Sequence, residues 1–574
     1  MKSNNQNLFL AVLLWLGVML GLYTFFPNLV GAKRPPQGTR QTASAPAQQA
    51  SAPVPAAPAV PAAVPPVEVP RGTSTHAPVK VVSFETPRAR VAVTSEGAAV
   101  QSVQLLGEKW TRHKGAKEES HVDLVGAHAG EPLPLTTVVK SAEGATLVAA
   151  DASYEVVKQD ATSVTMRTEQ SGVTVTKTIA VNPQSYGLQL GVEVRAPAGL
   201  TGHLSVLSGA YAEEPQGGLF ASRSNTPARA ICLAANNKVE RLAIGAKTPV
   251  FEGQGAGFAG IDEQYFLTAV LPPAGMAATC RLEAQGQKAG SLVASVSVPL
   301  QVAPGAAVAL AFTGYAGPKN DAELGAVSAA LKHSIDWGFW SVIAEFLLVI
   351  MKFFQSIVPG HNWGVAIILL TVAMKLLTFP LQHKSMKSMQ EMQRIQPQLE
   401  ELKKKYAGDT QRQNLEQMKL FKEHGVNPMG SCLPMLIQMP IWFALYTTLQ
   451  VSVELYNAPF IPGWLDDLTA KDPYYILPVA MGITMILTQV LTPSPMSNPS
   501  QKTMGYAMSG FFSLLMLTLP SGLTLYIFTN NVLSIGQQMY LRRTIGKPPA
   551  SGQTIEAQKK KGGDAGSERA KLPA

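Results

Sequence analysis

The chain has 574 residues and a formal charge of +9, and 46% of its residues are hydrophobic against 15% charged. This length exceeds one ordinary domain. The apolar residues concentrate at the extreme N-terminus and after Trp337, which predicts membrane spans joined to a large water-exposed part. The sequence contains no zinc-type Cys/His spacing, no phosphate-cradling glycine loop and no nucleophile elbow, so it predicts neither a metal nor another cofactor. A basic excess in such a chain usually marks cytoplasmic loops, and we therefore expect no DNA partner.

Residues 1–78 predict a membrane anchor followed by a linker. Residues 8–26 are uncharged and apolar, and at about 1.5 Å per residue they are long enough to cross a bilayer. We interpret residues 1–32 as an uncleaved anchor, because Val30-Gly31-Ala32 is a poor cleavage site; a cleaved signal peptide is the alternative. Residues 33–78 hold 11 prolines among many Ala, Ser and Gln residues. This composition predicts an extended tether without fixed structure.

Residues 79–320 alternate apolar and polar side chains at a period of two, with Gly, Pro and Asn between the runs. Strands this frequent, without helical periods between them, predict an antiparallel β-sandwich. The domain is interpreted either as a docking or binding module or as a folded spacer. Cys232 and Cys280 fall within it, and they either pair in an oxidising compartment or remain two buried thiols. The clearest runs are Val164-Met166-Thr168, Leu188-Leu190-Val192-Val194 and Val308-Leu310-Phe312.

Residues 321–360 predict an amphipathic helix that lies in the membrane interface. The stretch Asp336–Val358 is apolar but carries Glu345 and Lys352 near its middle, where a span should carry no charge. The alternative is a true span. It would invert everything that follows and place the next basic segment outside, against the positive-inside rule.

Residues 361–540 predict five spans with a helical hairpin, residues 382–425, after the first. Apolar residues recur along the hairpin at spacings of mostly three and four, which indicates two amphipathic helices around a turn. Pro397 should kink or interrupt the first of them. The run Pro520-Ser521-Gly522 is a turn signal that splits the last two spans. The expected spans are His361–Leu381, Cys432–Val451, Tyr474–Leu491, Met504–Leu519 and Gly522–Tyr540.

These segments give a topology that can be tested against charge. With the N-terminal anchor, six spans place Lys2, the hairpin and the basic tail, residues 541–574, on one side. The β-sandwich and the acidic loop 452–473 fall on the other side. The positive-inside rule then predicts cytoplasmic N- and C-termini. The fold class expected is a multi-pass α-helical membrane protein, with six spans and a five-helix core, that carries an antiparallel β-sandwich domain.

Lys375 is the candidate functional charge, because it lies within the first span after the sandwich. A Lys at the centre of a bilayer costs ~3 kcal/mol. The side chain either snorkels to the inner interface or lies in a water-filled cationic cavity open to the cytoplasm. Thr371 lies one turn away on the same face. Other spans contribute Gln438, Asn530 and Asn531, which are candidates for a polar lining or for hydrogen bonds between helices.

Methionine gives a second signal, because 16 of the 20 methionines lie between Met351 and Met539. Met is flexible and polarizable, and it suits surfaces that accept many apolar partners; ordinary filling of membrane helices is the alternative. The candidates for a contact surface in the spans are Met435, Met439, Met504 and Met508. The candidates in the hairpin are Met386, Met389, Lys403, Lys404 and Lys405.

Several motifs resemble the YidC membrane protein insertase family of Gram-negative inner membranes. They are HNWG at 361–364, VNPMGSCLPMLIQMPIWFALY at 426–446, DPYYILPVAMGITM at 472–485, LPSGLTLYIFTNN at 519–531 and GPK at 317–319. The resemblance implies a periplasmic β-supersandwich at 79–320 after a periplasmic linker, and a five-helix core at 361–540. The core of that family surrounds a hydrophilic groove that is open to cytoplasm and lipid and closed to the periplasm. The family usually has Arg at the position of Lys375 and often a second aromatic residue at the position of Ile527.

The resemblance implies an insertase and chaperone for nascent membrane proteins in the cell inner membrane. Its expected partners are the nascent spans, the lipid bilayer, and the Sec translocon with its accessory subunits. The hairpin and the basic tail would meet the ribosome or the signal-recognition-particle pathway. No enzyme activity is expected, since no acid/base pair suited to sugar chemistry stands out on the sandwich. The alternative function is a channel or small-solute transporter with a periplasmic binding domain.

Overall fold

The computed structural model describes residues 79–114, 118–125, 131–213, 227–425, 433–491 and 499–545. The predicted anchor at 1–32, the linker at 33–78 and the tail beyond residue 545 lie outside the described residues.

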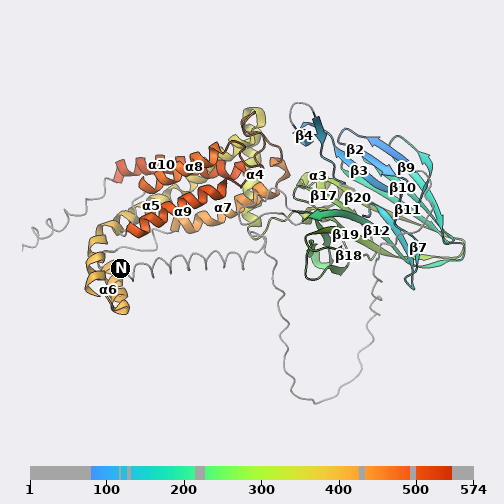
Figure 1. The fold of residues 1–574 in the computed structure, drawn as a ribbon, viewed down its shortest axis with the longest axis horizontal. Helices are drawn as coiled ribbons and strands as arrows, with labels where there is room; N and C mark the ends of the chain where they lie inside the picture. Colours follow the sequence, from blue (N-terminus) through green and yellow to red (C-terminus); the bar gives the residue numbers. More distant parts are fainter. Residues whose placement is uncertain are drawn as a thin grey trace, which may run out of the picture. The chain divides into compact units, whose positions relative to one another are not determined.

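Residues 81–318 form an antiparallel β domain built on two large sheets (Figure 1). The first has nine strands in the order β14-β13-β16-β17-β20-β11-β10-β9-β8, and the second has six in the order β15-β18-β19-β12-β6-β7. A three-stranded sheet, β1-β2-β3, and the hairpin β4-β5 complete the domain. The strands are β1 (Val81–Glu85), β2 (Ala89–Thr94), β3 (Ala99–Leu105), β4 (Thr111–Lys114), β5 (Glu118–His121), β6 (Thr136–Ser141), β7 (Thr146–Val148), β8 (Glu155–Gln159), β9 (Ser163–Gln170), β10 (Val173–Val181), β11 (Gly187–Arg195), β12 (Leu200–Glu213), β13 (Arg229–Leu233), β14 (Val239–Leu242), β15 (Val250–Gln254), β16 (Phe258–Asp262), β17 (Phe266–Leu271), β18 (Thr279–Ala284), β19 (Ala289–Val302) and β20 (Ala307–Pro318).

The period-two pattern of the sequence places alternate side chains in the core of the domain. Along β10, every second residue from Val173 to Val181 is buried, and β9 and β11 repeat the pattern beside it. The inner faces of the two large sheets pack on each other, with β16 and β17 against β12 and β19. The β-sandwich expected from the alternation is confirmed.

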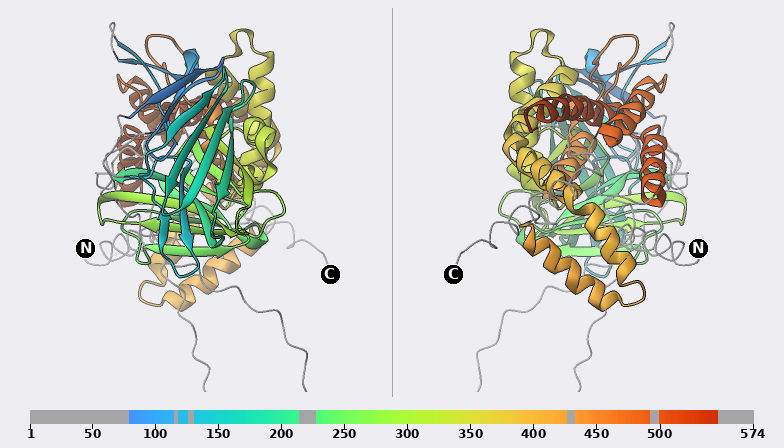
Figure 2. Two further views of the ribbon diagram at one scale, coloured as in Figure 1. Left: turned by 90° about the vertical axis from the view of Figure 1, so that its right-hand side faces the viewer. Right: turned by 90° about the vertical axis from the view of Figure 1, so that its left-hand side faces the viewer.

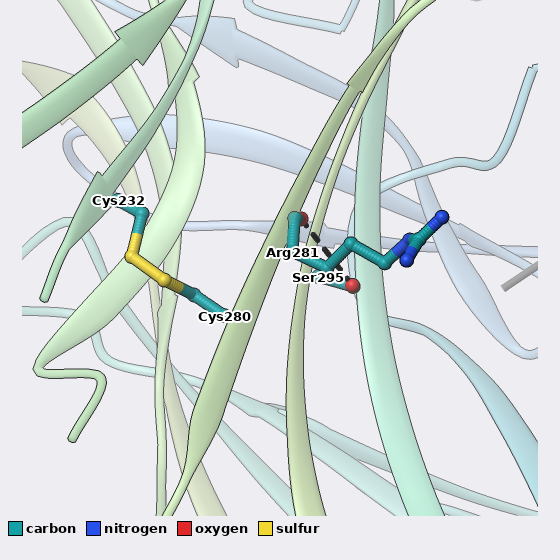
Figure 3. The surroundings of a disulfide bond; sticks show 4 residues. All are labelled: Cys232, Cys280, Arg281 and Ser295. Atoms are coloured by element: carbon teal, nitrogen blue, oxygen red, sulfur yellow. Dashed lines mark hydrogen bonds between the residues drawn. A yellow bond between two sulfur atoms is a disulfide. The ribbon is translucent and has the colours of Figure 1, made fainter. Parts of the chain in front are cut away.

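A disulfide between Cys232 of β13 and Cys280 of β18 joins the nine-stranded sheet to the six-stranded sheet (Figure 3). Both half-cystines are buried in the core. The sequence left open whether these cysteines pair, and the structure shows that they do. The bridge therefore acts as a covalent link across the interior of the sandwich.

Replacing both Cys232 and Cys280 with Ala is expected to lower the free energy of unfolding of the β domain by roughly 2–4 kcal/mol. The loss follows because the bridge closes a long loop, with a sequence separation of 48 residues, in the unfolded chain. Denaturant unfolding of the full chain in micelles, followed by β-sheet circular dichroism, measures the change. A reductant should destabilise the wild type and leave the double variant unchanged; equal sensitivity of the two proteins would contradict the prediction.

The region after the β domain is helical. It comprises α3 (Asp321–Val327), α4 (Ser341–Ile357), α5 (Trp363–Lys405), α6 (Thr410–Glu423), α7 (Leu433–Val451), α8 (Ile476–Leu491), α9 (Pro499–Met516) and α10 (Ser521–Ile545). By length and composition, the described part of the chain has one helix apolar enough to cross a membrane, Trp363–Met389 within α5; α8 is a shorter apolar helix. These helices therefore do not confirm the predicted count of six spans.

Helix α4 is amphipathic, as the sequence predicts. It buries Ala344, Leu347, Leu348 and Met351 and packs on α5 and α7. The opposite side exposes apolar side chains, with Val342 80% and Phe353 60% accessible. This side is suited to lipid, and α4 carries Glu345 at an exposed position beside it.

Helix α5 departs from the expected boundaries. It runs without interruption from the first expected span into the first arm of the hairpin, through both Pro380 and Pro397. Of the predicted kink or interruption at Pro397, the interruption does not occur. The residues around Pro397 keep the helix in place, because Met392, Ile395 and Leu399 pack with Leu420 and Phe421 of α6. Figure 2 shows α6 folded back along the C-terminal half of α5. The predicted split between the last two helices is confirmed, since α9 ends at Met516 and α10 begins at Ser521.

Candidate functional site

Four helices, α7 to α10, surround a cavity of about 260 Å³. Its walls are mainly apolar, and methionines come from three of the four helices. Side chains spaced four residues apart on one helix supply several walls, such as Met481 and Met485 on α8 and Phe512 and Met516 on α9. The lining residues are Gln438, Met439, Trp442, Met481, Met485, Phe512, Met516, Tyr526, Ile527 and Asn530.

The polar groups of the cavity come from α7 and α10. Gln438 Nε2 donates a hydrogen bond of 2.5 Å to the hydroxyl of Tyr526, which ties α7 to α10. Asn530 lies one turn after Tyr526 on α10, and Ser534 lies one turn further. Residues four apart share one face of a helix, so these three form a polar stripe on α10 that begins at the cavity.

Lys375 of α5 meets this polar stripe beyond the cavity. Its Nζ donates a hydrogen bond of 2.7 Å to Ser534 Oγ. The Ser534 hydroxyl in turn donates to the carbonyl oxygen of Asn530, at 2.6 Å. None of the ion pairs formed among the described residues includes Lys375. The ammonium is therefore held by a neutral partner at a partly buried position.

The other residues expected to line a polar groove lie at different places. Thr371 is buried and donates to the carbonyl oxygen of Ile367 in its own helix, and it does not line the cavity. Asn530 does line the cavity. Asn531 lies beside it in sequence, and its Nδ2 is buried without a hydrogen-bond partner in the described part of the chain. Of the expected polar set, the structure thus brings Gln438 and Asn530 into one site.

Of the methionines selected from the sequence, some line the cavity and others do not. Met439 lines the cavity. Met504 and Met508 lie on α9 at partly exposed positions away from the lining, whereas Met516 on the same helix lines it. Met435 lies in α7 but outside the residues whose side chains are described. On α9, the methionine that lines the cavity is therefore nearer the C-terminal end of the helix than the two methionines selected from the sequence.

The hairpin presents both an apolar and a basic feature. Met386 is buried and Met389 partly buried on α5. Lys403, Lys404 and Lys405 are exposed in the last turn of α5, where positive charge complements the helix dipole. On α6, Leu415 and Met418 expose 59% and 69% of their surface. The described part of the hairpin thus exposes apolar side chains on α6 and a cluster of lysines at the end of α5.

Several residues that line or adjoin the cavity were not predicted from the sequence. Ser534 carries no signal in the sequence, because a single serine in an apolar helix is common. Trp442, Met481, Met485, Phe512 and Met516 could have been grouped by their helical spacing, although the spacing does not say which faces meet. Ile527 lies in the lining together with Trp442, Phe512 and Tyr526, so the wall keeps aromatic residues despite the aliphatic side chain at 527.

The loop between α7 and α8, residues 452–475, ties the helices together away from the hairpin. Asn362, at the start of α5, donates to the carbonyl oxygen of Phe460. The backbone N–H groups of Ser521 and Gly522, at the start of α10, donate to Ala470 and Leu468. Hydrogen bonds from one loop thus fix the first turns of two helices that form the site.

The same loop is bonded to the β domain through Glu454. Its carboxylate pairs with Lys352 of α4 at 2.6 Å and accepts a hydrogen bond from Asn320 at 2.9 Å. Its carbonyl oxygen accepts from Lys109, whose pKa is lowered by burial and partly restored by Glu454. Helix α4, the start of α3 and the β domain therefore all bond to one residue of the loop, Glu454.

Aromatic side chains complete this junction. Tyr456 of the loop stacks on Trp110 of the β domain, with ring centroids 5.9 Å apart. It also contacts Tyr265 and Phe266, at 5.1 and 5.5 Å. Val453 beside it packs within the hydrophobic core of the β domain. The contacts are both apolar and charged, so the loop is an integral part of the junction.

The fold and the site together define a protein with a β-sandwich domain followed by a helical region, with a methionine-rich cavity between the helices. Residues 81–350 match the family model for the YidC periplasmic domain, and residues 353–548 match that for the 60Kd inner membrane protein. The chain belongs to the YidC membrane protein insertase family.

The relatives that support this assignment cover nearly the whole chain. A protein named membrane protein insertase YidC from Anaeromyxobacter sp. (strain Fw109-5) is 42% identical over 83% of this chain and 86% of its own length. Its counterpart from Anaeromyxobacter dehalogenans (strain 2CP-C) is 40% identical over 96% of this chain and 100% of its own length. A crystal structure of an active YidC insertase covers 81% of this chain and 94% of that chain, at 19% identity and a TM-score of 0.35. The assignment therefore rests on sequence.

Proposed function

We propose that this protein inserts transmembrane segments of nascent proteins into the cell inner membrane. The observation that carries the proposal is the pairing of a methionine-rich cavity with a polar stripe on α10 that ends at Lys375. A membrane segment needs an apolar surface for its span and a hydrated polar path for its flank. The cavity and the stripe offer both within one group of helices.

The membrane arrangement we propose has six spans. They are the N-terminal anchor, the Trp363–Met389 part of α5, and α7, α8, α9 and α10, with α4 in the interface. The N- and C-termini and the hairpin are cytoplasmic, and the β domain is periplasmic. Two observations support this orientation. The basic segments of the sequence then share one side, and the Cys232–Cys280 disulfide suits an oxidising compartment.

The mechanism we propose needs no bond cleavage and no nucleotide. The polar or acidic flank of a nascent span enters between the helices from the cytoplasmic side, drawn by the ammonium of Lys375. Partial hydration along Asn530 and Ser534 lowers the cost of moving the flank across. The apolar span slides along Met439, Met481 and Met516 and leaves into lipid. The methionines suit this role because their flexible side chains adapt to different apolar sequences.

The partners we propose follow from the exposed surfaces of the hairpin. Its lysines, Lys403 to Lys405, are suited to ribosomal RNA or to the signal-recognition-particle pathway. Exposed Leu415 and Met418 are suited to an apolar segment of the arriving chain. We also propose that the protein works either alone or with the Sec translocon and its accessory subunits.

Purified protein in liposomes is expected to insert a single-span test protein without nucleotide and without other proteins. Protection of the translocated flank from added protease measures insertion, and empty liposomes give the background. The alternative function, a channel or small-solute transporter, predicts flux of an encapsulated dye or ion without any protein substrate. Flux together with background levels of protected flank would overturn the proposal in favour of that alternative.

A further inference from the structure

The hydroxyl of Ser534 has a defined direction. Ser534 Oγ uses its one hydrogen to donate to the carbonyl oxygen of Asn530. A serine hydroxyl has one donor and two acceptor lone pairs, so toward Lys375 it can act only as an acceptor. An ammonium only donates, and the contact between Lys375 Nζ and Ser534 Oγ, at 2.7 Å, satisfies both groups. The hydroxyl is thus set to receive the lysine.

The contact also decides where the lysine points. The four-carbon stem of Lys lets an ammonium within a span reach toward the nearest water. The neighbours Leu376 and Leu377 expose 69% and 71% of their surface, so the outer side of α5 is apolar. The bond to Ser534 turns the ammonium instead toward α10, which packs against α5.

A hydroxyl holds the ammonium without cancelling its charge. A carboxylate in the same place would form an ion pair and leave little attraction for an incoming anion. One of the three donors of the ammonium is used among the described residues, by Ser534. The other two remain for water or for a carboxylate on a substrate.

We propose that Ser534 is a positioning residue that aims the charge of Lys375 at the polar stripe of α10 and so favours substrates with an acidic flank. This inference rests on the proposed function, since it names a residue that tunes the same site. Ser534 contacts Lys375 and α10, and it acts on the substrate through Lys375.

The test compares two substrates that differ in the flank of one span, acidic in the first and uncharged in the second. Ser534→Ala is expected to lower insertion of the acidic-flanked substrate roughly fivefold, as expected for loss of a hydrogen bond to a charged group. Insertion of the uncharged-flank substrate should stay within twofold of the wild type. Ser534→Thr, which keeps the hydroxyl, should restore the acidic preference. Ser534→Asp should abolish it by pairing with Lys375.

A double-mutant comparison separates positioning from a structural role. In a Lys375→Gln background, Ser534→Ala should cause no further loss, because no charge remains to be aimed. Ser509→Ala on α9 is the matched control, since that hydroxyl lies within hydrogen-bond distance of two acceptors, the carbonyl oxygen of Gly505 in its own helix at 3.2 Å and Gln489 Oε1 at 3.1 Å, and can donate to one of them. It should leave both substrates unchanged.

Two results would overturn the inference. One is an equal loss for both substrates after Ser534→Ala, and the other is an undiminished loss in the Lys375→Gln background. Failure of the proposed function would give a different result. In liposomes with the wild-type protein, neither the acidic nor the uncharged flank would then become protected from added protease. Thermal unfolding of each variant in micelles shows whether a loss comes from misfolding, and Ser534→Thr keeps the test valid if Ser534→Ala does not fold.

Discussion

Replacing Lys375 with Gln is expected to lower the insertion of acidic-flanked substrates by about tenfold, which corresponds to ~1.4 kcal/mol. In the proposed mechanism the ammonium attracts a carboxylate of the substrate in a partly hydrated site, where two unit charges 4 Å apart interact by about 4 kcal/mol at an effective dielectric constant of 20. Desolvation of both groups consumes part of this attraction. Gln keeps a polar group that can donate a hydrogen bond, on a side chain one atom shorter, and removes the charge, so the loss reports mainly on the charge.

Two further substitutions at the same position distinguish charge from geometry. Lys375→Arg keeps the charge and adds a planar fork, and it should retain insertion to within about twofold if only charge matters. Lys375→Glu should disfavour acidic flanks more strongly than Gln does and should favour basic ones. The measurement is the protected fraction of each flank in liposomes. If the Gln variant inserts acidic-flanked substrates as well as the wild type, the charge has no role in the mechanism.

The β domain shows what alternation in a sequence can predict and where it stops. The runs at Leu188–Val194 and Val308–Phe312 indicate strands by themselves, because each strand needs only its own pattern. Their pairing, β11 with β20, joins residues more than 100 positions apart. Such long-range pairs depend on the shape of the whole core. The pairing of Cys232 with Cys280 could not be predicted for the same reason, since the disulfide bridges two sheets whose relative positions local patterns do not determine.

Some boundaries of the helices could also be predicted from the sequence, and others could not. The break after α9 was predictable, because Pro520-Ser521-Gly522 combines a proline with two residues that favour turns. The continuity of α5 was not. A proline costs a helix about 3 kcal/mol, but contacts of Ile395 and Leu399 with α6 stabilise the turns on both sides of Pro397. Tertiary packing therefore accounts for the continuity of α5, and such packing cannot be predicted from the sequence of one segment alone.

The site was partly predictable because polar residues within apolar helices are costly and therefore conspicuous. Lys375, Gln438 and Asn530 were selected on that ground. Thr371 met the same criterion, yet its hydroxyl is satisfied by its own helix. Ser534 looked ordinary in the sequence, and its importance depends on the partner that α5 brings to it. Pairing across helices is the part that a sequence pattern cannot supply.

The run GPK at 317–319 supported the family resemblance without a physical reason, and the structure supplies one. Gly317 lies where a Cβ would approach the Cβ of Tyr186 at 2.6 Å, so only glycine fits. Tyr315 donates to the carbonyl oxygen of Pro318. Lys319 is buried and pairs with the fully buried carboxylate of Asp262, at 2.7 Å. The run thus closes the last strand of the β domain over a buried charge.

Replacing Asp262 with Asn is expected to lower the free energy of unfolding of the β domain by about 3–5 kcal/mol, as found when one partner of a buried ion pair is removed. Asp262 accepts from Lys319 and also pairs with Arg229 and Arg241, both at 3.1 Å. Removing its charge leaves three cations close together. Asp336→Asn is the matched control, because Asp336 is partly exposed and lies 3.8 Å from Arg241. It should cost less than about 1 kcal/mol.

The pH dependence of the free energy of unfolding provides a second test of the role of Asp262. Burial alone would raise the pKa of Asp262, but Lys319, Arg229 and Arg241 outweigh it and hold the pKa below its usual value. A carboxyl whose pKa is lower in the folded state contributes stability above its unfolded pKa, about 3.9, and loses it as the pH falls through the folded pKa. The gap in stability between the wild type and Asp262→Asn should therefore be constant from pH 8 to about 5 and shrink below about 4. A gap that stays constant to pH 2, or one no larger than that of Asp336→Asn, would show that the carboxylate of Asp262 does not hold the three cations together.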